Sequence, residues 1–227
     1  MFVGHFGVGF AGKAAAPRVS LGTLVLASQF IDLLWPTLLL LGLERVEVRP
    51  GITRVTPLDF VSYPISHSLL AVVLWGALFA GVYHLAKRSA AGSAVLFGAV
   101  VSHWLLDLLT HRPDLPLLPG SGPKVGLGLW SSLPATLVVE LALFATGVAL
   151  YVRATRPRDR AGTWALAGLV AFLLVVYAAN FFVGAPPDAK AIAWAGHAQW
   201  LLVIWAYAID RHRVPAETTG LRAAAAA

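Results

Sequence analysis

The sequence predicts an all-α protein, a polytopic membrane helix bundle with six transmembrane helices and a short N-terminal half-membrane helix. Of its 227 residues, 58% are hydrophobic and 12% are charged, whereas a soluble domain carries roughly 25% charged residues. Six apolar stretches approach the length of about 20 residues that a membrane span needs. The alternating apolar and polar segments of an outer-membrane barrel are absent. The chain is therefore expected to be an integral membrane protein.

The apolar stretches define one transmembrane domain over residues 1–210, followed by a flexible polar tail over residues 211–227. The six expected spans are Leu21–Leu43, Ile65–Ala86, Ala94–Leu109, Leu127–Val152, Trp164–Val183 and Ala191–Ile209. Before them, Phe2–Ala16 is apolar but too short to span, and it lacks the cationic start and cleavage site of a signal peptide. We expect it to form a half-membrane helix that folds back against the first span, since its glycines allow close backbone approach.

Two sequence features could suggest a nucleotide partner, and neither supports one. The glycines from Gly7 to Gly12 spell G-x-G-x-x-G, but no strand precedes them and the following acid, Asp32, lies inside an apolar run. The formal charge of +6 comes from basic residues between the spans, so it sets membrane orientation and does not indicate nucleic-acid binding. Eleven Lys and Arg lie on the side that holds both termini and six on the other side. The positive-inside rule then predicts cytoplasmic termini in a bacterial inner membrane, with loops 44–64 and 110–126 facing outward.

Three carboxylates, Asp32, Asp107 and Glu140, lie in apolar runs that contain no Lys or Arg. An acid inside a membrane span is costly and marks a candidate functional site. The ionisable residues that share these runs are histidines, mainly His67, His103 and His197. Protons or metal ions could neutralise the acids, and His with Asp and Glu is a metal-ligating set. The chain has no Cys, which excludes a thiolate site.

The polar residues of separate spans are predicted to lie at one depth in the membrane. At a rise of about 1.5 Å per residue, Asp32, His5, Asp107, Glu140 and His197 all lie roughly 20–21 Å from the cytoplasmic ends of their helices. His103 lies one turn from Asp107 on the same helix face, and His67 lies near the outer end of its span. In a hydrocarbon core of about 30 Å, this layer is nearer the outer face. We therefore expect a polar pocket that opens outward.

The most specific local pattern is His103-x-x-x-Asp107, whose spacing aims both side chains at one point. It stands within Ser102-His103-Trp104-Leu105-Leu106-Asp107, and Leu115-Pro116-Leu117-Leu118-Pro119 follows. Upstream are Gly4-His5 and Ser66-His67-Ser68. Over residues 1–120 this order resembles the bacterial LexA-regulated, membrane-bound metal-dependent hydrolase-like family (YdjM-like). The chain departs from the family's H-R-G element, where it has Ser62-Tyr63-Pro64.

The resemblance implies a set of metal ligands. The order of these ligands along the chain is also distantly similar to that in the zinc-dependent phospholipase C family. Carried over to this chain, the implied metal ligands are His5, Asp32, His67, His103, Asp107, His111 and Glu140. Thr136 stands at the place of that order's last His. For His103 and Asp107 the alternative is a buried hydrogen-bonded pair, and for His111 with Asp114 it is a solvated loop. The likeness to phospholipase C is one of fold and does not by itself indicate the same reaction.

Three functions remain open from the sequence. The first is a metal-dependent hydrolase acting on a lipid or a membrane-associated substrate, conceivably a phosphoester, with Asp32 or Glu140 taking the proton. Its ion would be Zn²⁺, with Mn²⁺ or Fe²⁺ as alternatives, and its rim cations would be Arg54, Arg112 and Lys124. The second is a proton-coupled or metal-ion transporter that uses the same side chains. The third is a scaffold whose polar layer locks helix packing, which explains three acids without basic partners poorly. The oligomeric state is not indicated.

Overall fold

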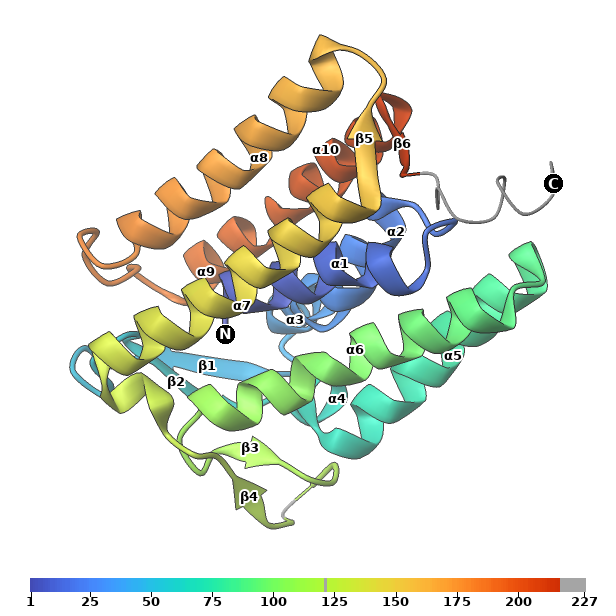
Figure 1. Cartoon of the computed structure of the whole chain (residues 1–227). Coiled ribbons are helices and arrows are strands. Elements are labelled where there is room, and N and C mark those ends of the chain that lie inside the picture. The colour runs from blue at the N-terminus through green and yellow to red at the C-terminus, as the bar shows by residue number, and fades with distance from the viewer. Residues whose placement is uncertain (121, 217–227) are drawn as a thin grey trace, which may run out of the picture.

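The computed structural model describes residues 1–120 and 122–216, which form a helical bundle with short hairpins at its ends (Figure 1). The first half of the chain contains α1 (Val3–Ala15), α2 (Leu21–Ser28), α3 (Phe30–Leu40), β1 (Arg45–Val48), β2 (Leu58–Ser62), α4 (Pro64–His67), α5 (Leu69–Lys87) and α6 (Ala90–Thr110). The second half contains β3 (Leu115–Pro116), β4 (Lys124–Val125), the 3-10 turn η1 (Leu129–Ser131), α7 (Leu133–Ala154), β5 (Thr155–Pro157), α8 (Arg160–Ala179), α9 (Ala189–His197), α10 (Gln199–Arg211) and β6 (Arg213–Pro215).

The predicted membrane bundle is confirmed. Five helical segments are long and apolar enough to cross a membrane, with α9 and α10 counted as one, and a bent pair of helices brings the number to six. The predicted starts of three spans shift by several residues, and the first of these is α6, which was expected from Ala94 and begins at Ala90. The span expected from Leu127 begins at Leu133 because the 3-10 turn η1 precedes it, and Ser132 caps the helix by accepting a hydrogen bond from the Ala135 N–H. The span expected from Trp164 begins at Arg160, where Asp159 is the cap.

Two of the expected spans are interrupted. The span predicted as one helix over Leu21–Leu43 consists of α2 and α3, which meet at Gln29 with a bend of 54°. The span predicted from Ile65 begins with the separate short helix α4, because Ser68 adopts an extended conformation and caps α5. Both breaks lie next to polar residues of the predicted layer, so they place helix ends at that depth.

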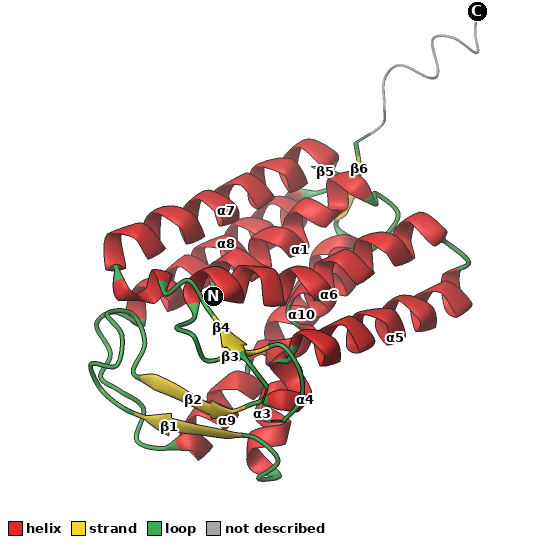
Figure 2. Ribbon diagram, turned by 90° about the horizontal axis from the view of Figure 1, so that it is seen from below, coloured by secondary structure: helices red, strands yellow, loops and turns green. Residues whose placement is uncertain are grey.

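The connections between the helices contain strands that the sequence analysis did not predict. β1 and β2 pair antiparallel, with Val46 opposite Phe60, and β3 pairs with β4. These two hairpins lie at one end of the bundle, whereas β5 and β6 pair at the opposite end (Figures 1 and 2). Residues 213–215 of the predicted tail are thus part of a hairpin, and residues 217–227 lie outside the described residues.

The N-terminal helix α1 lies in the centre of the bundle. It contacts α2, as expected, but it packs mainly against α7. Glycines make this contact possible, since a Cβ atom on Gly7 would meet the Leu143 carbonyl oxygen at 2.6 Å. A Cβ on Gly147 would collide with the Gly7 backbone. This close approach holds the start of α1 against the core, and His5 reaches Asp107 of α6 from there.

Gly147→Ala is therefore expected to destabilise the bundle. The new methyl group would meet backbone atoms of Gly7, which cannot rotate away, and overpacking of this kind costs about 1–3 kcal/mol. The measurement is the thermal unfolding midpoint of the purified protein in detergent. Gly98→Ala on α6 is the matched control, because a Cβ there has no atom of the described chain within 4 Å. Equal midpoints for the two variants would contradict the packing that we describe for α1 and α7.

Candidate metal centre

Five of the predicted ligands converge in the interior of the bundle. His5, His103 and Asp107 form one group, and Asp32, His67 and His103 form a second group that shares His103. In each group the ligating atoms lie within 4.8 Å of one another. The side chains come from α1, α3, α4 and α6, and all but Asp32 are buried. The i, i+4 pair on α6 brings His103 Nε2 to 3.4 Å from Asp107 Oδ2.

The break between α2 and α3 shapes the second group. A helix that ends at Ser28 leaves its last carbonyl groups without intrahelical donors, and the Ser28 carbonyl accepts a hydrogen bond from His103 Nδ1 at 2.9 Å. The new helix that begins at Phe30 has Asp32 in its first turn, where the helix dipole stabilises a carboxylate. The break between α2 and α3 therefore orients His103 and stabilises the carboxylate of Asp32, which faces it.

His67 is oriented through a chain of two hydrogen bonds. The buried carboxylate of Glu44 accepts from the N–H groups of Ile65 and Ser66, both at 2.8 Å, which anchors the start of α4. Its second oxygen accepts from Ser66 Oγ at 2.6 Å. Since the Ser66 hydroxyl proton is used in that bond, Ser66 Oγ must accept from His67 Nδ1, which lies at 2.7 Å. The proton of a neutral His67 ring is therefore on Nδ1.

His111 follows the same pattern at the end of α6. Its Nδ1 lies 2.9 Å from Asp114 Oδ1, and the Tyr63 hydroxyl donates to the same carboxylate oxygen at 3.1 Å. Burial raises the pKa of Tyr63, and the charge of Asp114 adds to this, so the phenol keeps its proton. Burial also lowers the pKa of His111, so the ring is neutral with its proton on Nδ1. His111 and Asp114 are both buried, and the alternative of a solvated loop is wrong.

In their neutral forms, three histidines thus direct unprotonated Nε2 atoms toward two carboxylates. The Nε2 atoms of His67 and His103 both lie 3.5 Å from Asp32 Oδ1. The Nε2 of His111 lies 4.0 Å from Asp107 Oδ2. Within the described part of the chain, His103 Nε2 has no hydrogen-bond partner although it is buried. Acceptor atoms that face each other in a buried site are unfavourable unless a cation binds between them.

The donor set fits a metal ion. Ligating histidines in proteins usually donate their second ring N–H to a carboxylate, a carbonyl or another polar group, which fixes the tautomer. His67, His103 and His111 meet that description through Ser66, the Ser28 carbonyl and Asp114. Imidazole with carboxylate and no thiolate suits Zn²⁺, and also Mn²⁺ or Fe²⁺. Each of the two overlapping groups, His5 with His103 and Asp107, and Asp32 with His67 and His103, could therefore hold a divalent cation.

His5 and the first residue meet at the other oxygen of Asp107. His5 Nε2 lies 3.1 Å from Asp107 Oδ1, and the Met1 amine lies 2.6 Å from the same atom. The His5 and His103 rings stack in parallel, with centroids 3.7 Å apart. His5 Nδ1 has no hydrogen-bond partner among residues 1–120 and 122–216, so His5 is the ligand of this set whose tautomer no contact outside the cluster fixes.

Two other polar residues of the predicted layer lie apart from the cluster. Glu140 is buried and lines the same cavity as Asp32 and Asp107, but it is in neither group of ligating atoms. Its Oε2 accepts from the N–H groups of Phe2 at 2.8 Å and Gly4 at 3.3 Å, so it anchors the start of α1. His197, which shares the predicted depth, contacts Thr37 through Nε2 at 3.1 Å.

Sequence reasoning missed Glu44 entirely and did not assign Ser66 a role. Glu44 directly follows an apolar stretch and resembles an ordinary acid of a connecting loop. No local signal shows that its carboxylate lies under residues 65 and 66, and the neighbouring Ser66-His67 pair was the only available hint. The polar contacts that fix the His67 tautomer therefore had to come from the structure.

The fold and the cluster together define a class: a multi-pass membrane protein with a buried His/Asp group that could hold a metal ion. The profile of the family described as YdjM inner membrane protein matches residues 2–183. The chain belongs to this family, which confirms the predicted resemblance and extends it beyond residue 120. No curated protein and no solved structure shows a significant match to the chain.

Proposed function

We propose that this protein is a membrane-embedded, metal-dependent hydrolase that acts on a lipid or another membrane-associated substrate. The observation that carries the proposal is the set of fixed histidine tautomers. Three Nδ1–H groups are tied to acceptors outside the cluster, and three Nε2 atoms face Asp32 and Asp107. A scaffold would need no such arrangement, since hydrogen bonds from His to Asp would lock helices equally well. Zn²⁺ is the proposed ion, held by His5, Asp32, His67, His103 and Asp107, with His111 adjacent.

The proposed reaction adds water to an ester. When bound, a divalent ion would lower the pKa of a water molecule and polarise the ester oxygen. An oxygen of Asp32 accepts a proton from the water as the water oxygen adds to the phosphorus or carbonyl carbon. The ester bond to the leaving oxygen then breaks, and the alcohol, as it leaves, takes up the proton that Asp32 had accepted. Asp32 suits this role because 23% of its side chain is exposed, compared with 3% for Asp107, and because it lines the cavity.

Glu140 is the second proposed proton acceptor. It lines the same cavity, and two backbone N–H groups hold one of its oxygens. The proposed orientation places both termini in the cytoplasm, with the β1–β2 and β3–β4 hairpins outside. The charge asymmetry of eleven to six basic residues supports it. The substrate would then reach the site from the outer side of the inner membrane.

Metal content and its removal test the proposal. Protein purified in detergent is expected to carry stoichiometric zinc, or manganese or iron, by elemental mass spectrometry. Chelation should remove the metal and, with it, the hydrolysis of bis(4-nitrophenyl) phosphate or a 4-nitrophenyl ester in mixed micelles. Adding Zn²⁺ back should restore both. Protein without bound metal and without metal-dependent hydrolysis would overturn the proposal.

A transporter is the second candidate, and one observation favours it. Transporters often place their sites at broken helices, and the breaks at Gln29 and Ser68 lie beside the cluster. Neither the sequence nor the family match indicates the inverted repeats that commonly accompany such sites. Proton-driven flux of a metal ion into liposomes, with no hydrolysis, would establish this alternative.

A further inference from the structure

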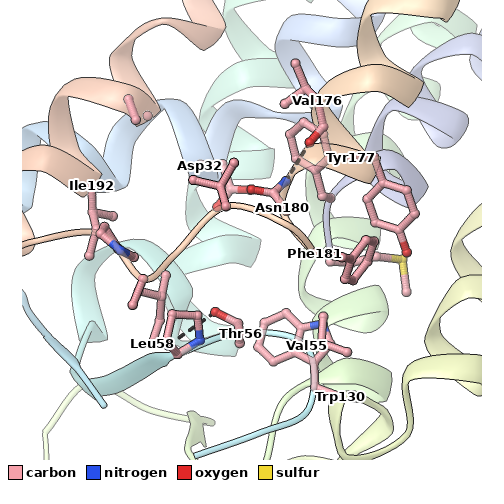
Figure 3. Close-up of a pocket in the computed structure, with 18 of the residues that line it drawn as sticks. Asp32, Val55, Thr56, Leu58, Trp130, Val176, Tyr177, Asn180, Phe181 and Ile192 are labelled. Carbon is pink, nitrogen blue, oxygen red and sulfur yellow. Dashed lines mark hydrogen bonds between the residues drawn. The ribbon is translucent and has the colours of Figure 1, made fainter. Parts of the chain in front are cut away.

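A large cavity adjoins the candidate metal centre. It has a volume of about 1080 Å³, at the upper end of the roughly 300–1,000 Å³ of small-molecule sites. Asp32, His67, Asp107, His111 and Glu140 lie on its wall. The rest of the lining is largely apolar and comes from the 50–58 segment, Trp130, the end of α8, and α9 with α10. Figure 3 shows Asp32 facing the same space as Trp130, Tyr177 and Phe181.

The cavity reaches the surface that faces lipid. Phe172 of α8 and Leu201 of α10 line it, yet they are 45% and 67% exposed. Both residues belong to segments apolar enough to cross a membrane. An opening between two spans, bordered by exposed apolar side chains, gives access from the bilayer. A hydrocarbon chain can enter such an opening without being exposed to solvent.

The cavity wall also carries a cation. Arg54 is the single Lys or Arg among the lining residues, and its side chain forms no ion pair within the described ranges 1–120 and 122–216. Its backbone N–H is held by the Trp130 carbonyl at 3.0 Å. The other two predicted rim cations are engaged, since Arg112 pairs with Asp59 at 2.8 Å and Lys124 donates to the Val61 carbonyl. A guanidinium suits a phosphate ester, which it can bind with two hydrogen bonds.

From these three features we infer the substrate class: an anionic phosphate-ester lipid. Its hydrocarbon chain occupies the cavity between α8 and α10, and its phosphate binds Arg54 beside the metal centre. The inference rests on the proposed function in calling the lipid a substrate. Lipid binding itself is a separate property, because the apolar walls and Arg54 are present whether or not a metal is bound.

Native mass spectrometry of the full chain in detergent, after chelation, tests the binding. The probe is dioleoyl phosphatidylglycerol. Dioleoylglycerol provides the same chains without phosphate, and glycerol 3-phosphate provides the phosphate ester without chains. We expect one tightly retained phosphatidylglycerol, weaker retention of dioleoylglycerol, and no competition by glycerol 3-phosphate. Full competition by glycerol 3-phosphate would mean a site for soluble phosphate esters and would overturn the inference.

Paired variants locate the bound lipid. Val176→Trp fills the cavity, whereas Val175 lies on the same helix, is 66% exposed and is not among the lining residues. Val176→Trp should weaken retention about tenfold or more, the loss expected when roughly 1.4 kcal/mol of binding is removed, and Val175→Trp should not. Ile192→Trp fills the cavity from α9 and is the second variant to measure if Val176→Trp does not fold. If a folded cavity-filling variant and Val175→Trp retained phosphatidylglycerol equally well, the proposed position of the hydrocarbon chain would be refuted.

Arg54→Gln tests the head group. It should weaken the binding of phosphatidylglycerol about tenfold or more, because the phosphate loses its charge-assisted hydrogen bonds, and leave the binding of dioleoylglycerol unchanged. Arg45→Gln, at an exposed arginine outside the cavity, is the control. If the protein hydrolyses chromogenic esters but retains no lipid, this inference fails and the proposed function stands. If it retains the lipid as predicted but hydrolyses nothing with metal bound, the proposed function fails and the lipid site stands.

Discussion

Replacing Asp107 by Asn is expected to abolish metal binding and hydrolysis together while leaving the protein in the membrane. Asp107 contacts His5 through one oxygen at 3.1 Å and His103 through the other at 3.4 Å. Asn keeps the shape but removes the negative charge and replaces one acceptor with an N–H₂ donor. The loss of metal affinity should exceed the roughly 10–100-fold effect that is typical of residues behind the ligands.

Competition against a chromogenic chelator, followed by the hydrolysis assay on the same preparation, measures this effect. Asp188→Asn is the matched control, since Asp188 caps α9 by accepting from Ala191 N–H at 2.8 Å and Asn caps a helix about as well as Asp. A variant that keeps stoichiometric metal but loses activity would show that Asp107 is not a ligand. A variant that changes only a proton-driven flux would favour the transporter.

Much of the fold follows from composition and periodicity. Apolar runs with few charges predicted the spans because backbone groups in lipid must be satisfied within a helix. The polar layer followed from the constant rise of a helix, and His103 with Asp107 followed from the i, i+4 spacing. These inferences needed only local sequence, and the structure brings five of the predicted ligands into two overlapping groups.

The remaining features depend on contacts between distant segments. No Gly or Pro marks the break at Gln29, and Pro36 of the same span lies within α3 without ending it. The break leaves the Ser28 carbonyl free to accept from His103, 75 residues away. Similarly, the glycines of α1 indicated close packing but not that the main partner would be α7. Local patterns carry no information on such partners, because they are set by the assembled bundle.

The second large effect is expected from Glu44→Gln, at a residue outside the ligand set. The two oxygens of Glu44 have separate roles: one accepts from the N–H groups of Ile65 and Ser66, and the other accepts from the Ser66 hydroxyl. A Gln side chain can keep its oxygen on the two N–H groups and place its N–H₂ against Ser66 Oγ. The start of α4 would then remain anchored, while the polarity of the second contact would be reversed.

The reversed hydrogen bond should change the tautomer of His67 in the metal centre. With Gln as the donor, the Ser66 hydroxyl accepts from it and donates its own proton to His67 Nδ1, so the ring proton moves to Nε2. An Nε2–H cannot ligate a metal. We therefore expect metal affinity to fall about 10–100-fold, as for other partners of ligating histidines, with little change in the thermal unfolding midpoint of the metal-free protein. Glu47→Gln is the control, because Glu47 pairs with exposed arginines of the β1–β2 hairpin.

Nitrogen NMR of ¹⁵N-histidine-labelled, metal-free protein distinguishes this effect from simple loss of structure. His67 should change from the Nδ1–H to the Nε2–H tautomer in Glu44→Gln and keep the Nδ1–H tautomer in Glu47→Gln. Ser66→Ala removes the hydroxyl that transmits the change, so adding Glu44→Gln to it should cost little further affinity, giving a strongly non-additive cycle. Additive losses, or an unchanged His67 tautomer, would mean that Glu44 stabilises α4 without determining which nitrogen of His67 faces Asp32 and Asp107.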